Sequence, residues 1–184
     1  LSVALLGCWV GWIRLGTCGI NDQLPALCLL AGLLLVERRA RRPAAIGIAI
    51  IAAGTAIKPY LAAWAPAIAG YAGLWTLAVF VVVAAIAWLP ALGWGPATYL
   101  ASVEKARAIH PVPESSLNLP EARVIAIPLA LLGFLARSFG TMVTAGTAVF
   151  AAVLFLDRWA SFGYLLVLLP PIGVVLERAW WRRS

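Results

Sequence analysis

Long apolar segments alternate with short polar turns along most of the chain. Each segment is continuously apolar and lacks the strict alternation of transmembrane β-strands. Apolar runs repeated without a polar domain between them are typical of proteins that cross a lipid bilayer. We therefore predict an all-α fold, a polytopic transmembrane bundle of about seven or eight membrane segments. The predicted segments cover residues 1–13, 24–36, 44–57, 59–72, 74–89, 124–136, 141–156 and 159–176.

Composition agrees with this prediction. Hydrophobic residues make up 64% of the chain and charged residues only 11%, whereas soluble domains are about 25% charged. We expect residues 1–184 to form a single integral-membrane domain. The chain begins with Leu-Ser-Val inside an apolar run, without an initiator methionine or a charged leader. We therefore expect it to be truncated at its N-terminus rather than to begin with a signal peptide.

The path of the chain through residues 44–72 is open to two interpretations. Lys58, Pro59 and Pro66 lie inside this otherwise apolar stretch. A lysine at the centre of a membrane helix costs about 2.5–3.5 kcal/mol, and a proline biases the residue before it away from helical geometry. Either one long, kinked helix continues through Lys58, or the chain breaks at Lys58-Pro59 and returns as a second arm. We favour the break because two prolines interrupt the stretch and because the C-terminal charges directly follow a helix.

Clustered arginines orient the predicted bundle. The net charge is +7, and the turn at residues 37–43 should face the cytoplasm because loops on that side are enriched in Lys and Arg. This turn carries Arg38, Arg39, Arg41 and Arg42. A break at Lys58 adds Arg137, Arg178, Arg182 and Arg183 to the same side, whereas a continuous helix adds Lys105, Arg107, Arg123 and Arg158 instead. Nucleic-acid binding is not expected, since no basic groove with aromatic platforms is visible.

Residues 93–123 form the one long polar segment. Within it, Leu100, Val103, Ala106 and Ile109 recur at helical spacing. We predict a short helix over residues 98–109 that lies in the membrane interface rather than crossing the bilayer. The favoured break makes the whole segment an extracytoplasmic loop.

This loop supplies one group of candidate site residues. A charged face on an interfacial helix is usually only solvated, but a loop this long in a compact protein is often functional. Glu104 and Glu114 are candidate bases, Lys105 and Arg107 are candidate phosphate ligands, and His110 lies between them.

Two further candidates lie elsewhere. Asn21 and Asp22 immediately precede a predicted helix, where Asp serves as an N-cap, or where its carboxylate binds a sugar hydroxyl or a cation. Lys58 either extends to the interface from a helix end or binds an anion such as a lipid phosphate.

Metal chemistry is not expected. Cys8, Cys18 and Cys28 form no CxxC pair, and His110 is the single histidine, so no cluster with metal-ligand spacing exists. Phosphate-binding and dinucleotide-binding glycine motifs and the nucleophile elbow are also missing.

Several short motifs, in this order, resemble a known enzyme family. Gly19-Ile20-Asn21-Asp22 opens a Leu- and Ala-rich helix, a basic turn follows, and the next helix ends in Ala56-Ile57-Lys58-Pro59-Tyr60. The long loop then carries Tyr99-Leu100 and Ser115-Ser116-Leu117. Over residues 15–137 the chain resembles the middle and C-terminal part of the glycosyltransferase 87 family, GT-C enzymes that use polyprenol-phosphate mannose or arabinofuranose donors.

The resemblance implies a fragment of a membrane enzyme of the cytoplasmic membrane that transfers a sugar from a polyprenyl-phosphate donor to a cell-envelope acceptor. It implies no cofactor besides this donor substrate, and a general base that lies outside this chain. Asn21 and Asp22 would line the sugar pocket, and Lys58, beside Tyr60, would meet the donor phosphate. Two rival hypotheses are a lipid or solute transporter and a non-catalytic membrane scaffold. A transporter requires polar groups that line a passage through the bundle, whereas a scaffold requires no such groups.

Overall fold

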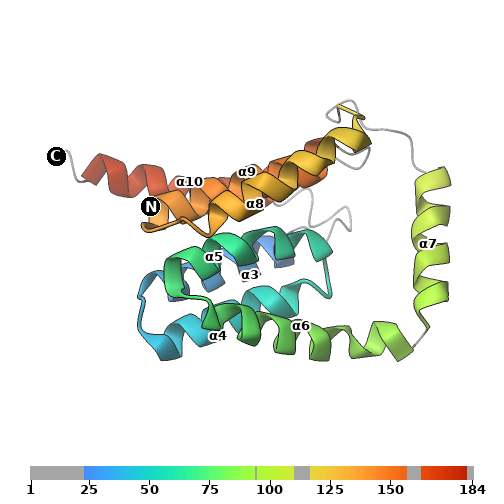
Figure 1. Cartoon of the computed structure of the whole chain (residues 1–184), viewed down its shortest axis with the longest axis horizontal. Helices are drawn as coiled ribbons and strands as arrows, with labels where there is room; N and C mark the ends of the chain where they lie inside the picture. Colours follow the sequence, from blue (N-terminus) through green and yellow to red (C-terminus); the bar gives the residue numbers. More distant parts are fainter. Residues whose placement is uncertain (1–22, 94, 110–116, 157–162, 182–184) are drawn as a thin grey trace.

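A computed structural model describes residues 23–93, 95–109, 117–156 and 163–181. Within these residues every regular element is helical, which confirms the all-α prediction. The α-helices are α3 (Gln23–Glu37), α4 (Arg41–Gly54), α5 (Ala65–Ala72), α6 (Trp75–Gly93), α7 (Pro96–Ile109), α8 (Ala126–Gly133), α9 (Phe139–Phe155) and α10 (Gly163–Trp181). Two 3₁₀-helices, η1 (Pro59–Trp64) and η2 (Pro120–Ile125), precede α5 and α8. Figure 1 shows these helices as one bundle, with α7 set apart at one end.

The chain breaks at Lys58, as favoured. Helix α4 ends at Gly54, whose backbone oxygen accepts hydrogen bonds from the amides of Ile57 and Lys58, both at 3.0 Å. Lys58 then adopts an extended conformation, with φ −142° and ψ 108°, before Pro59 opens η1. The pre-proline position explains this geometry, because the proline ring disfavours the helical region for the residue before it. A single continuous helix through Lys58 is therefore excluded.

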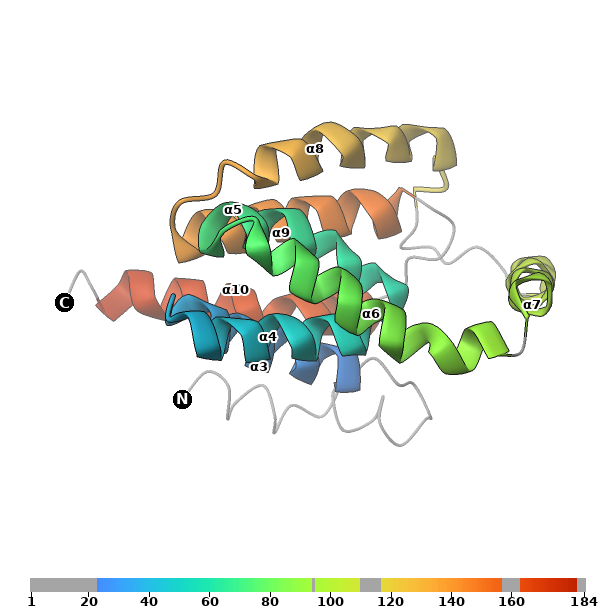
Figure 2. The same cartoon turned by 60° about the horizontal axis from the view of Figure 1, so that its bottom comes forward.

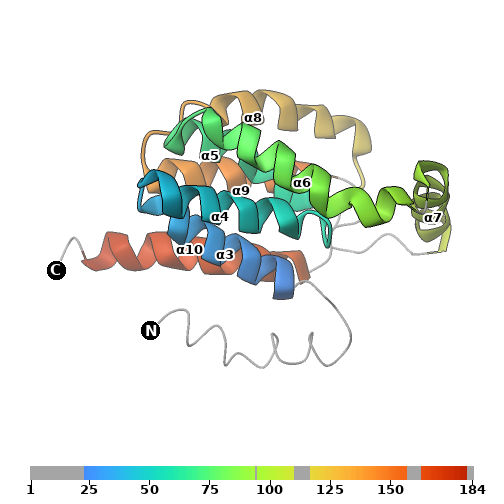
Figure 3. The ribbon, with the colours of Figure 1, turned by 90° about the horizontal axis from the view of Figure 1, so that it is seen from below.

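The returning arm, η1 and α5, forms the centre of the bundle. Its side chains Leu61, Trp64 and Ile68 are fully buried. Helices α4, α6, α8 and α9 pack around it, as Figure 2 shows from a second direction. The hairpin of α3 and α4 covers one flank, and α10 packs against α3 and α9 (Figure 3).

Small residues let these helices approach closely. A Cβ on Gly32 of α3 would lie 2.7 Å from the backbone oxygen of Gly47 in α4. A Cβ on Gly146 of α9 would lie 2.6 Å from Cδ2 of Trp64. Backbone contact through glycine is the usual packing of helices in membranes, where no hydrophobic effect drives one apolar side chain onto another.

The described helices differ in length and apolarity. Among the described residues, α6 alone is long and apolar enough to cross a bilayer, with a mean hydropathy of 2.3 over its most apolar window. Helices α3 and α9 are apolar but shorter. The 14 residues of α4 span about 21 Å at 1.5 Å per residue, less than a hydrocarbon core of about 30 Å. The multi-pass arrangement therefore stays a prediction.

Several helix boundaries differ from those predicted. Helix α4 lies three residues earlier than the predicted 44–57, so Arg41 and Arg42 belong to it rather than to a turn, and α6 ends at Gly93 rather than at residue 89. The segment expected at residues 124–136 begins earlier, because Pro120 starts η2 and a proline suits the first position of a helix. The final helix, expected to end at residue 176, continues to Trp181. Its extension carries Arg178 into an ion pair with Glu37. The helix predicted at residues 98–109 is confirmed as part of α7, Pro96–Ile109, and its location in the membrane interface stays a prediction.

Candidate functional site

The two ends of the bundle differ in chemistry. At one end α3, α5, α8 and α10 finish and α4, α6 and α9 begin (Figure 1). This arginine end, as we call it, is defined by Arg38, Arg39, Arg41, Arg42, Arg137 and Arg178. At the other end lie the turn from α4 to η1 and the crosswise helix α7. We call this second end the Lys58 end.

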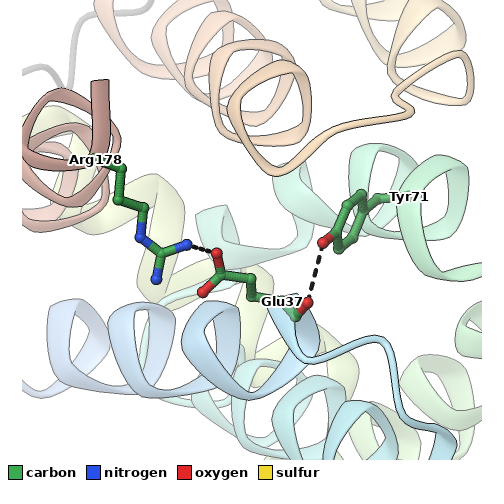
Figure 4. A network of polar contacts seen from close by, with 3 residues as sticks. All are labelled: Glu37, Tyr71 and Arg178. Carbon is green, nitrogen blue, oxygen red and sulfur yellow. Dashed lines mark hydrogen bonds and ion pairs between the residues drawn. The ribbon is translucent and has the colours of Figure 1, made fainter. Parts of the chain in front are cut away.

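An ion pair closes the arginine end. The guanidinium of Arg178 on α10 contacts the carboxylate of Glu37 at the end of α3, and the side chains are 38% and 23% exposed. The hydroxyl of Tyr71 on α5 donates a hydrogen bond of 3.1 Å to the backbone oxygen of Glu37. In Figure 4 the carboxylate points toward Arg178, and the backbone oxygen points toward Tyr71. Glu37 thus connects the ends of three helices.

Arg137 ties the end of α5 to the end of α8. Its Nη1 donates to the backbone oxygens of Gly70 at 2.9 Å and Phe134 at 3.1 Å. These carbonyls lie near the C-termini of α5 and α8, where backbone oxygens lack helical partners and a cation is favoured. Arg39 in turn donates to the backbone oxygen of Arg137.

Aromatic rings extend this network to α9. The Arg39 guanidinium carbon lies 4.3 Å from the centroid of the Tyr71 ring, and that of Arg178 lies 5.0 Å from the centroid of the Phe139 ring. The Tyr71 and Phe139 rings meet edge to face, with centroids 6.5 Å apart. Cations over aromatic faces are stabilised by the ring quadrupole. Arg39 is therefore held by its ring contact and its hydrogen bond, and Arg178 by its ring contact and its ion pair.

The Lys58 end is organised around Trp88. Its indole Nε1 donates a hydrogen bond of 3.1 Å to Thr55 Oγ1, which itself donates to the backbone oxygen of Ala52 at 2.6 Å. The Trp88 ring also meets the ring of Tyr99 on α7 edge to face, with centroids 5.6 Å apart. Trp88 therefore connects α7 to the turn that carries Lys58.

An apolar recess opens beside this tryptophan. Its volume is about 180 Å³, and it lies between the last turns of α6 and the first turns of α7. Its lining is Trp88, Ala91, Leu92, Pro96, Tyr99 and Leu100. Leu92 and Leu100 are 52% and 62% exposed, so the recess borders an open apolar surface.

The structure places four of the predicted site residues at the Lys58 end. Lys58 is half-buried in the turn, and Tyr60 follows two residues later. The Tyr60 ring is only 8% exposed and packs edge to face on Phe150, with centroids 5.0 Å apart. Lys105 is exposed on α7, and Arg107 lies on the same helix. Asn21, Asp22 and His110 lie outside the described residues.

Sequence reasoning missed two pairings. The sequence pattern places Glu37 only in a polar turn, although it is the carboxylate directly before the four arginines. Thr55 gave no signal, because its role depends on Trp88, 33 residues later in the chain. Within the described ranges no group of three His, Cys, Asp or Glu residues could hold a metal ion.

No protein-family model, curated protein or solved structure matches the chain.

Proposed function

We propose that this protein is a segment of an integral-membrane glycosyltransferase of the cytoplasmic membrane. It would transfer mannose or arabinofuranose from a polyprenyl-phosphate donor to an acceptor in the cell envelope. The observation that carries this proposal is the position of Lys58, which lies at the end opposite the arginines and three residues after Thr55, the hydrogen-bond partner of the recess residue Trp88.

Exposed apolar side chains support a membrane location. On α6 these include Val81, Val82, Ile86 and Leu89, which are 57% to 62% exposed. Helix α8 exposes Ile127, Leu131 and Leu132 to a similar degree. Apolar surfaces of this extent mark contact with lipid or with a partner. Short helices such as α4 fit a bilayer through local thinning or through burial among neighbouring helices.

The Lys58 end combines two features that are suited to binding a lipid phosphate. A lysine supplies a cation for the phosphate, and an apolar recess is suited to the first isoprene units of the chain. Negative charge builds on the phosphate as the glycosidic bond breaks, so a nearby cation lowers the barrier. Helix α7 lies crosswise to the bundle (Figures 1 and 2), as a helix in the interface plane would. By the family resemblance, the general base lies outside this chain.

A donor-binding experiment tests this proposal. The chain is placed in phosphatidylcholine nanodiscs, and binding of fluorescent undecaprenyl phosphate is compared with that of undecaprenol, which lacks the phosphate. We expect Lys58→Gln to weaken phosphate binding about tenfold, the loss of one charge-assisted contact, and to leave undecaprenol binding unchanged. Arg42→Gln, at the arginine end, is the charge-matched control.

The recess is tested separately. Leu100→Ser removes an apolar side chain from its lining and should weaken both ligands. Leu119→Ser is the matched control, because Leu119 is 51% exposed but does not line the recess. Unchanged binding in Lys58→Gln and Leu100→Ser would contradict the proposal and favour a transporter or a scaffold.

A further inference from the structure

A second cavity lies at the arginine end, outside the site proposed above. Its volume is about 190 Å³, well above the roughly 10–15 Å³ that a single water molecule requires. The first residues of α9 form one wall and the last turns of α10 form the other. The lining residues are Ser138, Phe139, Gly140, Val175, Arg178 and Ala179. We call this cavity the α9–α10 recess.

The polar groups of this recess include several hydrogen-bond donors. Arg178 carries five guanidinium N–H groups in a planar fork that matches phosphate oxygens. Its Nη1 contacts Glu37, and the Phe139 ring supports the group from one side. At the start of α9, Ser138 Oγ accepts from the Thr141 amide at 3.1 Å. The remaining first-turn amides belong to Phe139 and Gly140, and the first-turn amides of a helix have no partner within it.

The charge around the recess is strongly positive. Six described arginines lie at this end, and the described carboxylates there are those of Glu37 and Glu177. The charge of Glu37 is matched by Arg178 in the ion pair. An anion that enters the recess therefore meets an excess of positive charge and the positive end of the α9 dipole.

Exposed leucines lie close in sequence to the residues that line the recess. Leu176, between the lining residues Val175 and Arg178, is 64% exposed. Leu135, which precedes the start of α9, is 65% exposed. A ligand with an anionic head and apolar chains matches this arrangement, whereas a free anion would use only the polar part.

We propose that the α9–α10 recess binds the phosphate group of an anionic phospholipid, with Arg178 and the start of α9 as its ligands. The acyl chains would then lie along the exposed leucines of α10 and of the α8–α9 turn. The choice of a lipid rests on the membrane location proposed above. The site is separate from the Lys58 end, because α10 ends at the end of the bundle opposite α7 (Figure 3).

Native mass spectrometry of the chain in a neutral detergent tests this assignment. Phosphatidylglycerol is titrated against the wild type, with phosphatidylcholine as the neutral comparison. We expect one phosphatidylglycerol to be retained preferentially, and Arg178→Gln to weaken its binding about tenfold or more. Arg42→Gln removes an exposed arginine from the same end but not from the recess, and should cost about fivefold at most.

A second variant guards against misfolding of Arg178→Gln, which leaves Glu37 without its partner. Ala179→Leu fills the recess and keeps the ion pair, so it should also weaken phosphatidylglycerol binding. Equal losses in Arg42→Gln and Arg178→Gln, or full binding by Ala179→Leu, would overturn the proposal in favour of diffuse electrostatic attraction. Inorganic phosphate is added as a competitor, and binding of phosphate without retention of the lipid would also overturn it.

The readout is independent of the glycosyltransferase proposal. Lys58→Gln should leave phosphatidylglycerol binding unchanged, and Arg178→Gln should leave undecaprenyl phosphate binding at the Lys58 end unchanged. Failure of one proposal is therefore visible without failure of the other.

Discussion

Arg39 donates a hydrogen bond to the backbone oxygen of Arg137, which lies 98 residues further along the chain. This contact places the turn between α3 and α4 beside the turn between α8 and α9. Arg39 has a left-handed backbone with φ 55°, a conformation that costs a non-glycine residue about 1–2 kcal/mol. The contacts with Arg137 and Tyr71 hold it there.

Substitutions at Arg39 should separate backbone strain from side-chain contact. Arg39→Ala loses the contacts and keeps the strain, whereas Arg39→Gly loses the contacts and relieves the strain. We expect Arg39→Gly to be more stable than Arg39→Ala by about 1 kcal/mol. Denaturant titration in detergent micelles measures this difference. At the neighbouring exposed Arg38, where no positive φ is present, the order should reverse, because alanine is the better choice on ordinary backbone. The same order of stability for the alanine and glycine variants at Arg39 and at Arg38 would contradict backbone strain at Arg39.

The Glu37–Arg178 pair should contribute modestly to stability. Both side chains are partly exposed, so we expect a coupling energy of about 1 kcal/mol in a double-mutant cycle of Glu37→Gln and Arg178→Gln. The coupling should fall in high salt. Tyr71→Phe removes the neighbouring hydrogen bond, which the Tyr71 hydroxyl donates to the backbone oxygen of Glu37. Glu37→Gln leaves this hydrogen bond in place. A coupling energy near zero at low salt would show that the two side chains do not interact.

Gly146 should be intolerant of any side chain. Its α-carbon faces the fully buried ring of Trp64, and a rigid indole cannot move aside as a flexible chain would. We expect Gly146→Ala to lower the free energy of unfolding by about 2 kcal/mol. Gly93→Ala is the matched control, because a Cβ there would meet no atom within 4 Å. Equal stability of the two variants would mean that α9 does not press on Trp64.

The two ends of the bundle should face opposite sides of the membrane. Cysteines are placed at Ser102 on α7 and at Arg42 in a background without Cys8, Cys18 and Cys28. An impermeant maleimide added to intact cells should label Ser102→Cys at once. It should label Arg42→Cys only after the cells are opened, since arginine-rich turns stay in the cytoplasm. Labelling of both cysteines from the same side would remove the basis for the proposed topology.

Local sequence signals predicted the elements but not their partners. The break at Lys58-Pro59 was predictable because proline acts on the residue directly before it, and α7 was predictable because helical spacing is a local pattern. The pairing of Thr55 with Trp88 and of Glu37 with Arg178 was not, since each joins residues brought together only by packing. The central position of η1 and α5 was also not predictable, because a short apolar segment has the same sequence pattern whether protein or lipid surrounds it.

The burial of Trp64 has a consequence for the order in which the protein can be completed. Trp64 is synthesised before α6, α7 and α8, yet the glycine surface that covers it belongs to α9, which follows them. A nascent chain that has not reached Gly146 therefore holds its central indole uncovered. The core closes only after α9 has been made, and truncation before α9 would remove the cover of the residue at the centre of the bundle.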